Sequence, residues 1–206
     1  MVATAAGVVV LAGCSTGGAI DTSAPPTSRD VSAPSTSRTT STMPYAGAPK
    51  VSNPLPASVL DGDPCANALT PEQVKQAIGV QVAGKPNTLV AEALGPSCAW
   101  ANITSLGQII VTYVTQPRTG LSGVYKNTKP KNPVWREISD LHGFPAVAFS
   151  DNTDHDCTVT IGIADDLSVD VGGILGDTKR GKADSCEVVA QMAGLVVDTV
   201  KKRAGA

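Results

Sequence analysis

The sequence is poor in aromatic side chains, in charge and in histidine, and each shortage narrows what the protein can be. Of its 206 residues, 3% are aromatic, 17% are charged and 2 are histidine. A core must therefore be built mainly from Val, Ile, Leu and Ala. The formal net charge of −2 provides no basic surface for phosphate groups, so we do not expect nucleic acid as a partner. The run of about 18 apolar residues that a membrane-spanning helix needs does not occur.

Familiar catalytic and metal-binding patterns are missing as well. The G-x-S-x-G turn of serine hydrolases and the C-x-x-C pair of many zinc sites are both absent. Asp151, Asp154, His155 and Asp156 form the one cluster that could hold a metal, but their spacing fits neither an EF-hand loop nor a histidine-pair zinc motif. We interpret them as a solvated acidic turn, and His142 as a surface histidine. We predict no catalytic residue, metal site or cofactor, although 18 acidic residues leave open a carboxylate pair that only folding would assemble.

A short apolar run precedes Leu11-Ala12-Gly13-Cys14, which has the form of a bacterial lipobox. This pattern predicts a signal peptide over residues 1–13 and cleavage before Cys14, whose thiol would carry a diacylglycerol. We therefore expect the protein at the cell membrane, lipid-anchored on its extracytoplasmic face, with the membrane as a partner. Residues 1–4 carry no basic side chain, which is unusual for a signal peptide. Either the true start lies upstream or the signal is a poor one; the alternative is an ordinary apolar N-terminus that is not exported.

Residues 14–60 consist mostly of Ser, Thr, Pro, Gly and Ala. A segment of this composition cannot bury enough apolar surface to offset the entropy of ordering it, so we predict a disordered tether after Cys14. Flexible-coil scaling gives such a tether an end-to-end distance of roughly 35–40 Å. Ser and Thr with Pro are also typical of O-glycosylated stalks, and an unmodified tether is an equal alternative. Residues 61–206 then form a single folded domain.

The sequence contains five cysteines, and an odd number leaves one of them unpaired if the others form disulfides in a secreted protein. If Cys14 is lipidated, four remain: Cys65, Cys98, Cys157 and Cys186. These are widely spaced and accompanied by only two histidines, which favours two disulfides in an oxidising compartment over a zinc site or a redox-active pair.

Two stretches of the predicted domain have clear helix signals. Thr70-Pro71-Glu72-Gln73 supplies a cap, a proline at the first position and a capping box, so a helix of about eight residues is expected to end near Gly79. Residues 182–203 repeat apolar side chains every three or four positions and finish with Lys201, Lys202 and Arg203, which complement the helix dipole. A short N-terminal and a long C-terminal helix are therefore predicted.

Between the helices, the pattern indicates strands. The expected strands cover residues 97–101, 108–115, 146–149, 157–163 and 167–171, with a short strand or turn at 135–138. Residues 141–145 are expected to form a loop and residues 116–133 a long irregular connection. We expect Trp100 to pack in the core beside a disulfide and leave the place of Trp135 open. The sum is an α+β domain: a mostly antiparallel sheet of about five or six strands with both helices packed on it.

Several of these blocks, in order, resemble a known family. They are Asp63-Pro64-Cys65, Leu69 to Val74 with Ile78-Gly79, Cys98 with Trp100, Cys157 before a Val/Ile strand, and Cys186-Glu187 opening the last helix. Behind a lipobox, they resemble the actinobacterial (mycobacterial Lpr/Lpp-type) lipoproteins that share a domain of unknown function, number 3558. The resemblance covers residues 61–202. It implies a cell-envelope lipoprotein and offers no catalytic residues to transfer.

Four cysteines allow three pairings. Within the family reading, the preferred pairing is Cys65 with Cys98 and Cys157 with Cys186. Each bond would close a loop of about 30 residues and contribute on the order of 3 kcal/mol to stability.

The preferred function is a non-catalytic binding or interaction module displayed on the envelope, with an envelope protein or a small molecule as its partner. One alternative is a hydrolase acting on envelope polymers or lipids. Another is a carrier of an apolar ligand, which requires a cavity of a few hundred Å³ between helix and sheet.

Overall fold

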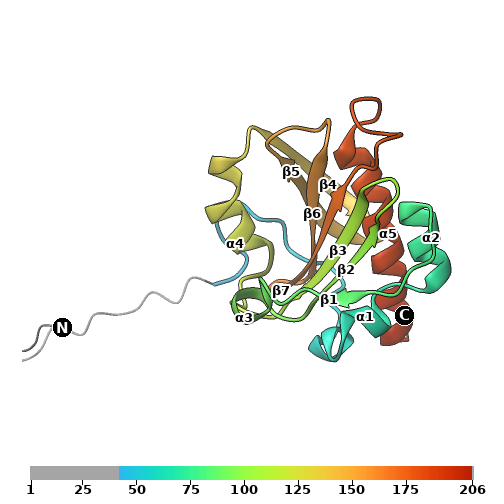
Figure 1. Ribbon diagram of the computed structural model, residues 1–206. Coiled ribbons are helices and arrows are strands. Elements are labelled where there is room, and N and C mark those ends of the chain that lie inside the picture. The colour runs from blue at the N-terminus through green and yellow to red at the C-terminus, as the bar shows by residue number, and fades with distance from the viewer. Residues whose placement is uncertain (1–41, 206) are drawn as a thin grey trace, which may run out of the picture. The chain divides into compact units, whose positions relative to one another are not determined.

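The computed structural model describes residues 42–205, and their centre is one antiparallel sheet. Its seven strands lie in the order β1-β2-β3-β7-β6-β5-β4. They are β1 (Lys85–Pro86), β2 (Ser97–Asn102), β3 (Gly107–Val114), β4 (Val134–Leu141), β5 (Phe144–Ser150), β6 (Asp156–Ala164) and β7 (Leu167–Ile174). The helices are the 3-10 turns η1 (Ala57–Leu60) and η2 (Lys129–Lys131), and α1 (Pro64–Asn67), α2 (Pro71–Ile78), α3 (Ala91–Leu94), α4 (Gly120–Asn127) and α5 (Ser185–Ala204). Helix α5 packs on one face of the sheet and α4 on the other (Figure 1).

The structure confirms the α+β class with an antiparallel sheet, and it corrects the strand count. About five or six strands are predicted from the sequence, whereas the described residues form seven. The additional strand is β1, whose two residues pair with Ala99 and Cys98 of β2. Two residues are too short to produce an alternating pattern, so only the pairing itself identifies this strand.

The two predicted helices are present: α2 begins at the predicted cap, and α5 covers most of the predicted range 182–203. The Thr70 hydroxyl accepts from the Gln73 amide at 3.3 Å, and the Gln73 side chain accepts from the Thr70 amide at 2.7 Å. Helix α5 starts three residues later than predicted, because the side chain of Asp184 caps it by accepting from the Glu187 amide at 3.1 Å. Both helices are fixed by local interactions, which is why the sequence alone indicates them.

Helix α4 lies inside residues 116–133, where we expected only an irregular connection. Gly123 lies in its interior, where glycine is less favourable than alanine by about 1 kcal/mol. Leu121 and Tyr125 are buried one turn apart, against Val147 of β5. Tertiary packing, not propensity, therefore holds this helix.

The expected loop over residues 141–145 is a tight turn between β4 and β5. Leu141 pairs with Phe144, so only His142 and Gly143 connect the two strands. Both have positive φ angles, 54° and 97°. A two-residue turn with positive φ at both positions matches the right-handed twist of the strands that it joins.

The sheet face under α5 carries the core of the domain. Buried side chains from alternate positions of three strands meet α5 there: Ile109, Val111, Tyr113, Val159, Ile161, Val169 and Val171. We call this the α5 face. Helix α5 comes close at Gly173, where an added Cβ would lie 2.4 Å from a methyl group of Val189. The predicted core position of Trp100 is confirmed, with 2% of its surface exposed.

Two disulfides join this face to its helices. Cys65 of α1 is bonded to Cys98 of β2, and Cys157 of β6 to Cys186 of α5, with Cα–Cα distances of 5.1 and 5.0 Å. These are the pairs preferred from the sequence.

The folded domain begins before Asp61, where the sequence composition placed its start. Val51, Val59 and Leu60 are all buried in the core. The Leu55 amide donates to the carbonyl of Ile163 at 3.0 Å. The few apolar residues in this Pro-rich stretch are enough to order it, because they are buried against a sheet that the rest of the domain forms. The predicted signal peptide, Cys14 and the rest of the predicted tether up to residue 41 lie outside the described residues.

Among the helices of residues 42–205, none combines the length and the apolar character required to cross a membrane.

Candidate ligand site

A row of polar side chains crosses the sheet on the face opposite α5, which we call the α4 face. Ser97, Thr112, Asp170 and Thr160 lie directly opposite one another on β2, β3, β7 and β6. Because residues paired across antiparallel strands point to the same side, all four belong to one face. The Ser97 and Thr112 hydroxyls are 2.8 Å apart, and the Thr160 hydroxyl donates to Asp170 Oδ1 at 2.6 Å.

A cavity of about 250 Å³ lies between this row and α4. Its apolar wall includes Leu94 of α3, Val114 of β3, Val124 of α4 and Phe149 of β5. Its polar floor consists of Thr160, Ser168 and Asp170 of the sheet, and Thr119, Asn127 and Thr128 add polar groups beside α4. A mainly apolar hollow with a few convergent polar groups is the usual form of a small-molecule site, and this one lies at the small end of the usual size range.

Asp170 is the titratable group that the cavity floor presents. Asp170 is partly buried, between the fully buried core residues and the exposed surface residues. Burial raises the pKa of Asp170 to about 6, and the hydrogen bond from Thr160 opposes this rise only in part. A carboxyl group with such a pKa changes its charge close to neutral pH.

Ser168, two residues before Asp170 on the same face of β7, has an unsatisfied hydroxyl. Its residue is 1% exposed, and its Oγ has no hydrogen-bond partner among residues 42–205. Leaving a buried polar group unpaired costs roughly 1–3 kcal/mol. The other buried serines have partners; the Ser185 hydroxyl, for example, donates to the carbonyl of Asp156 at 2.8 Å. The Ser168 hydroxyl is thus left for a hydrogen-bond partner from outside residues 42–205.

Helix α4 is held over the sheet by two contacts. Leu121 rests on Gly162 of β6, where an added Cβ would lie 2.9 Å from a Leu121 methyl group. Tyr125 meets Trp135 edge-on, with ring centroids 5.1 Å apart, and Trp135 stacks on Phe149 at 6.1 Å. Trp135, whose place the sequence left open, is therefore half-buried in an aromatic cluster that supports the roof of the cavity.

A second hollow of about 180 Å³ lies one row further along the same face. Ile110, Gly172 and Thr158 are opposite one another there, on β3, β7 and β6. Gly172 has no side chain to fill the space above it, and the nearest atoms to an added Cβ would be 3.9 Å away. The α4 face is therefore open beyond the cavity, and a ligand longer than the cavity could extend over Gly172.

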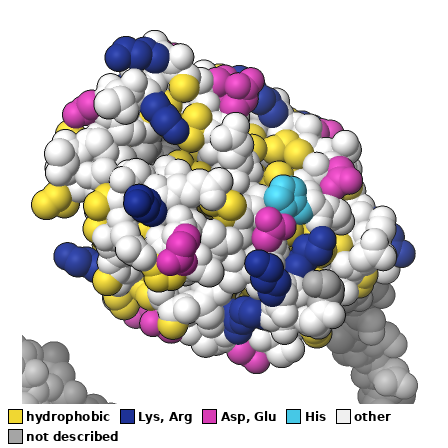
Figure 2. Space-filling view, turned by 90° about the vertical axis from the view of Figure 1, so that its right-hand side faces the viewer, with side chains coloured by type: hydrophobic (Ala, Val, Ile, Leu, Met, Phe, Trp, Pro, Cys, Tyr) yellow, Lys and Arg dark blue, Asp and Glu magenta, His cyan; other side chains and the backbone are white. Residues whose placement is uncertain are grey.

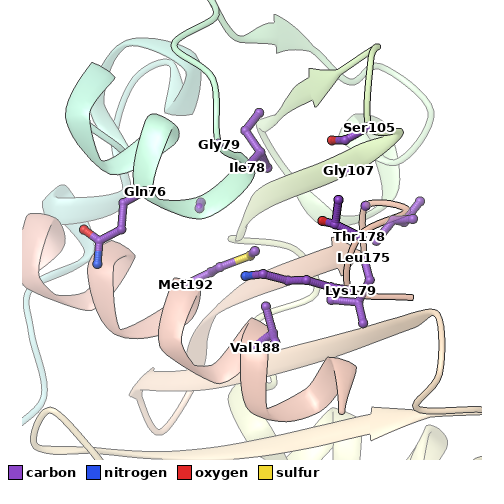
Figure 3. A pocket seen from close by; sticks show the side chains of 13 residues that line it. Gln76, Ile78, Gly79, Ser105, Gly107, Leu175, Thr178, Lys179, Val188 and Met192 are labelled. Carbon is purple, nitrogen blue, oxygen red and sulfur yellow. The ribbon is translucent and has the colours of Figure 1, made fainter. Parts of the chain in front are cut away.

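A separate hollow of about 170 Å³ lies on the other side of the molecule, between α2, α5 and the β2–β3 turn (Figure 3). The side chain of Lys179 lies across it, with its amino end beside Met192. Ile78 and Val188 also line it. The surface on that side mixes acidic and basic side chains, and its hydrophobic atoms form small separate groups (Figure 2). Among the described residues, no buried and unpaired polar atom lines this hollow. It therefore lacks the kind of unsatisfied group that Ser168 gives to the cavity beside α4.

The residues that the sequence singled out lie away from the cavity. His155 and Asp156 are adjacent on the surface, with Nδ1 and Oδ1 3.1 Å apart, while Asp154 takes part in a turn with Asn152. Within residues 42–205, no three His, Cys, Asp or Glu side chains gather in a way that could hold a metal. His142 is partnered: its Nδ1 is 2.7 Å from Oδ1 of Asp198 on α5.

Sequence reasoning missed Thr160, Ser168 and Asp170. All three occupy the outward positions of the alternating β6–β7 hairpin, which the pattern assigns to solvent. The only signal was a carboxylate among hydroxyl residues in the middle of a strand.

Comparison with known proteins identifies one family. The model of a family described as "Protein of unknown function (DUF3558)" matches residues 9–199. Neither the curated proteins nor the solved structures include a match to this chain.

Proposed function

The chain belongs to the DUF3558 family, and from that premise we propose that it is an actinobacterial cell-envelope lipoprotein whose domain binds a small molecule without transforming it. The lipid on Cys14 holds the protein on the extracytoplasmic face of the membrane. The cavity between α4 and the sheet is the binding site. The membrane and a small molecule are its partners.

Anchoring at Cys14 is supported by the lipobox and by the use of the other cysteines. Cys65, Cys98, Cys157 and Cys186 are all consumed in two disulfides, which suits an oxidising compartment outside the cytoplasm. Cys14 is thus the one cysteine left for another chemistry.

Lipidation is tested in an actinobacterial host fed with an alkyne-bearing palmitate. The wild-type protein is expected to take up the label and to sediment with membranes. Cys14→Ser removes the acceptor thiol, so the label should be lost and the protein released. Ser15→Ala, a neighbouring change that keeps Cys14, is the control and should behave as the wild type. Labelling of Cys14→Ser at the wild-type level would refute the anchor.

The observation that carries the binding function is the buried, unpaired hydroxyl of Ser168 in a cavity with an apolar wall. A buried polar group without a partner in the protein is satisfied by an ordered water or by a ligand, or else it lowers the stability of the fold. Its position in a cavity with an apolar wall supports a ligand. Binding is favoured over catalysis because acid–base and nucleophilic chemistry require at least two positioned reactive groups. Asp170 is the one titratable side chain that the described residues place on the cavity wall.

The binding function is tested by mass spectrometry of small molecules extracted from the natively purified full chain. A molecule present in stoichiometric amount in the wild type should be lost from Val124→Trp, because an indole at this position fills the cavity. Leu89→Trp places the same side chain on the surface, where Leu89 is 93% exposed, and should retain the molecule. Equal retention in both variants would exclude the cavity as the site.

A further inference from the structure

We propose that the ligand of this cavity is a small amphipathic amine, with its ammonium group at Asp170 and its apolar part against Val114, Val124 and Phe149. This proposal rests on the proposed function, since it names the chemical class that the same cavity accepts. Three features of the site support it: its uncompensated charge, its supply of hydrogen-bond acceptors and its size.

Asp170 lines the cavity, and no cationic side chain of residues 42–205 pairs with its carboxylate. Among the described residues, the Thr160 hydroxyl is its only hydrogen-bond donor. Two cationic side chains on the surrounding segments pair with other groups: Arg118 with Asp166, and Lys129 with Glu137. Lys129 also lies over the rings of Tyr125 and Trp135.

The remaining charged groups on the helices that cover the cavity do not line it. These are Lys126 on α4 and Glu92 on α3. Asp170 is thus a partly buried carboxylate for which residues 42–205 supply no ion partner. Partial removal of a carboxylate from water costs free energy, and pairing with a cation offsets that cost. A cationic ligand supplies that cation, whereas an anionic ligand is repelled and a neutral one leaves the charge uncompensated.

The polar floor matches the donors of an ammonium group. A primary ammonium has three N–H donors and no acceptor. Asp170 has one oxygen engaged with Thr160 and a second that is free of hydrogen bonds from residues 42–205. The Ser168 hydroxyl can accept a further bond, either directly or from a second polar group of the ligand. Asp170 is the one acidic side chain among the described residues that line the cavity, whereas divalent metal sites usually contain several carboxylates.

The volume of the cavity limits the size of the ligand's apolar part. A cavity of about 150 Å³ lined by aliphatic and aromatic side chains holds benzene. The present cavity, of about 250 Å³, therefore accommodates one ring or a branched chain of similar size together with a short aminoalkyl group.

Binding of an amine at this site depends on pH in a defined direction. The amine stays protonated throughout the range, so only the state of the carboxyl group changes. The pKa of Asp170 lies at about 6 in the empty site. Affinity for the amine should accordingly fall as the pH is lowered from 7.5 to 5, since protonation of Asp170 removes the attraction.

The test uses three probes of equal size and different charge: 2-phenylethylamine, 2-phenylethanol and phenylacetate. Their affinities for the full chain are measured by calorimetry, with Asp170→Asn as the variant and Asp177→Asn, an exposed aspartate outside the cavity, as the control. We expect the amine to bind best. Asp170→Asn should weaken the amine about tenfold or more, as the loss of a charge-assisted hydrogen bond does, and leave the alcohol nearly unchanged. Asp177→Asn should change neither the affinity for the amine nor the affinity for the alcohol.

The outcomes separate the two proposals. If the alcohol or the acid binds in the cavity more tightly than the amine, or if Asp170→Asn leaves the amine unaffected, the inference is wrong while the binding function stands. If none of the three probes binds, or if Val124→Trp binds the amine as well as the wild type does, the proposed site fails and the inference fails with it.

Discussion

On the α5 face of the sheet, strands β3, β6 and β7 present Val, Ile and Tyr. On the α4 face, alternate residues of the same strands are mostly Thr, Ser, Asp and Gly, with Ile110 and Val114 among them. The first set is fully buried under a helix of 20 residues and fastened to helices by both disulfides. The second set meets a helix of 8 residues across a cavity. The comparison teaches that stability is concentrated on one face, which leaves the other face free to keep unsatisfied polar groups for a ligand. Each experiment below tests that division.

The largest effect is expected from truncation of the core. Ile161 of the α5 face is 0% exposed, and Ile161→Ala should lower the free energy of unfolding by about 4 kcal/mol, through lost burial and a residual void. Ile110 of the α4 face is half-buried, so Ile110→Ala should cost less than about 1 kcal/mol. Urea denaturation of both variants measures the difference. Equal losses of unfolding free energy would show that stability is not concentrated on the α5 face.

Removal of a disulfide comes next. The double change Cys157→Ser with Cys186→Ser frees a loop of 29 residues and should cost about 3 kcal/mol. Removing the Cys65–Cys98 bond, with a sequence separation of 33, should cost a similar amount. Since both bonds stand on the α5 face, affinity for the amine probe should be unchanged at temperatures where the variants are folded. A large loss of affinity would show that the two faces are coupled.

Asp170 makes stability depend on pH in the direction opposite to a salt-bridged carboxylate. Its pKa is raised from 3.8 to about 6 in the folded state, so between these values the folded protein holds a proton that the unfolded chain has released. Stability from this group is therefore present below pH 4 and is lost as the pH rises through about 6. We expect a loss of about 2 kcal/mol, less than the full shift implies because the site is partly open to water.

Asp170→Asn should flatten the stability curve between pH 4 and 7 and leave the protein more stable at pH 7.5 than the wild type. Asp177→Asn is the matched control and should reproduce the wild-type slope in that window. Chemical denaturation at several pH values measures these curves. If the stability of Asp170→Asn varied with pH in parallel with that of the wild type, this carboxyl group would be fully solvated.

The smallest predicted effect is a change in the free energy of unfolding that has opposite signs for two buried serines. Ser168→Ala removes an unpaired hydroxyl and should raise the unfolding free energy by up to about 1 kcal/mol. Ser185→Ala leaves the carbonyl of Asp156 without its donor and should lower the unfolding free energy by about 1 kcal/mol. Thermal unfolding of the pair measures both changes. A destabilised Ser168→Ala would indicate that the hydroxyl already has a partner.

How far the sequence alone predicts this fold depends on the range of the interactions involved. Helix α2 is predictable because Thr70, Pro71 and Gln73 cap it within four residues. The β6–β7 hairpin is predictable because its alternation and its turn are local. Helix α4 is not, since Gly123 disfavours it and its support comes from Gly162, about forty residues away.

The candidate site escapes prediction for the same reason. Its polar residues appear in the sequence only as the outward side of a hairpin, and no local pattern shows that α3 and α4 cover them. The cavity exists because β3 pairs with β7 and not with β4, the strand that follows it in the chain. That register brings Thr112, Asp170 and Thr160 into one row.

The first described residues give the domain a mechanical asymmetry. The Tyr45 amide donates to the Ser122 hydroxyl of α4 at 2.9 Å, and Ala48 packs on the aromatic cluster of the same helix. Further along, the Val51 amide donates to Asp165 Oδ1 at 2.9 Å. Tension applied from the N-terminal side therefore reaches α4, the roof of the cavity, before it reaches any strand of the α5 face. Under such tension, the proposed ligand site would deform first, and the core that the disulfides fasten would bear the force only after α4 had yielded.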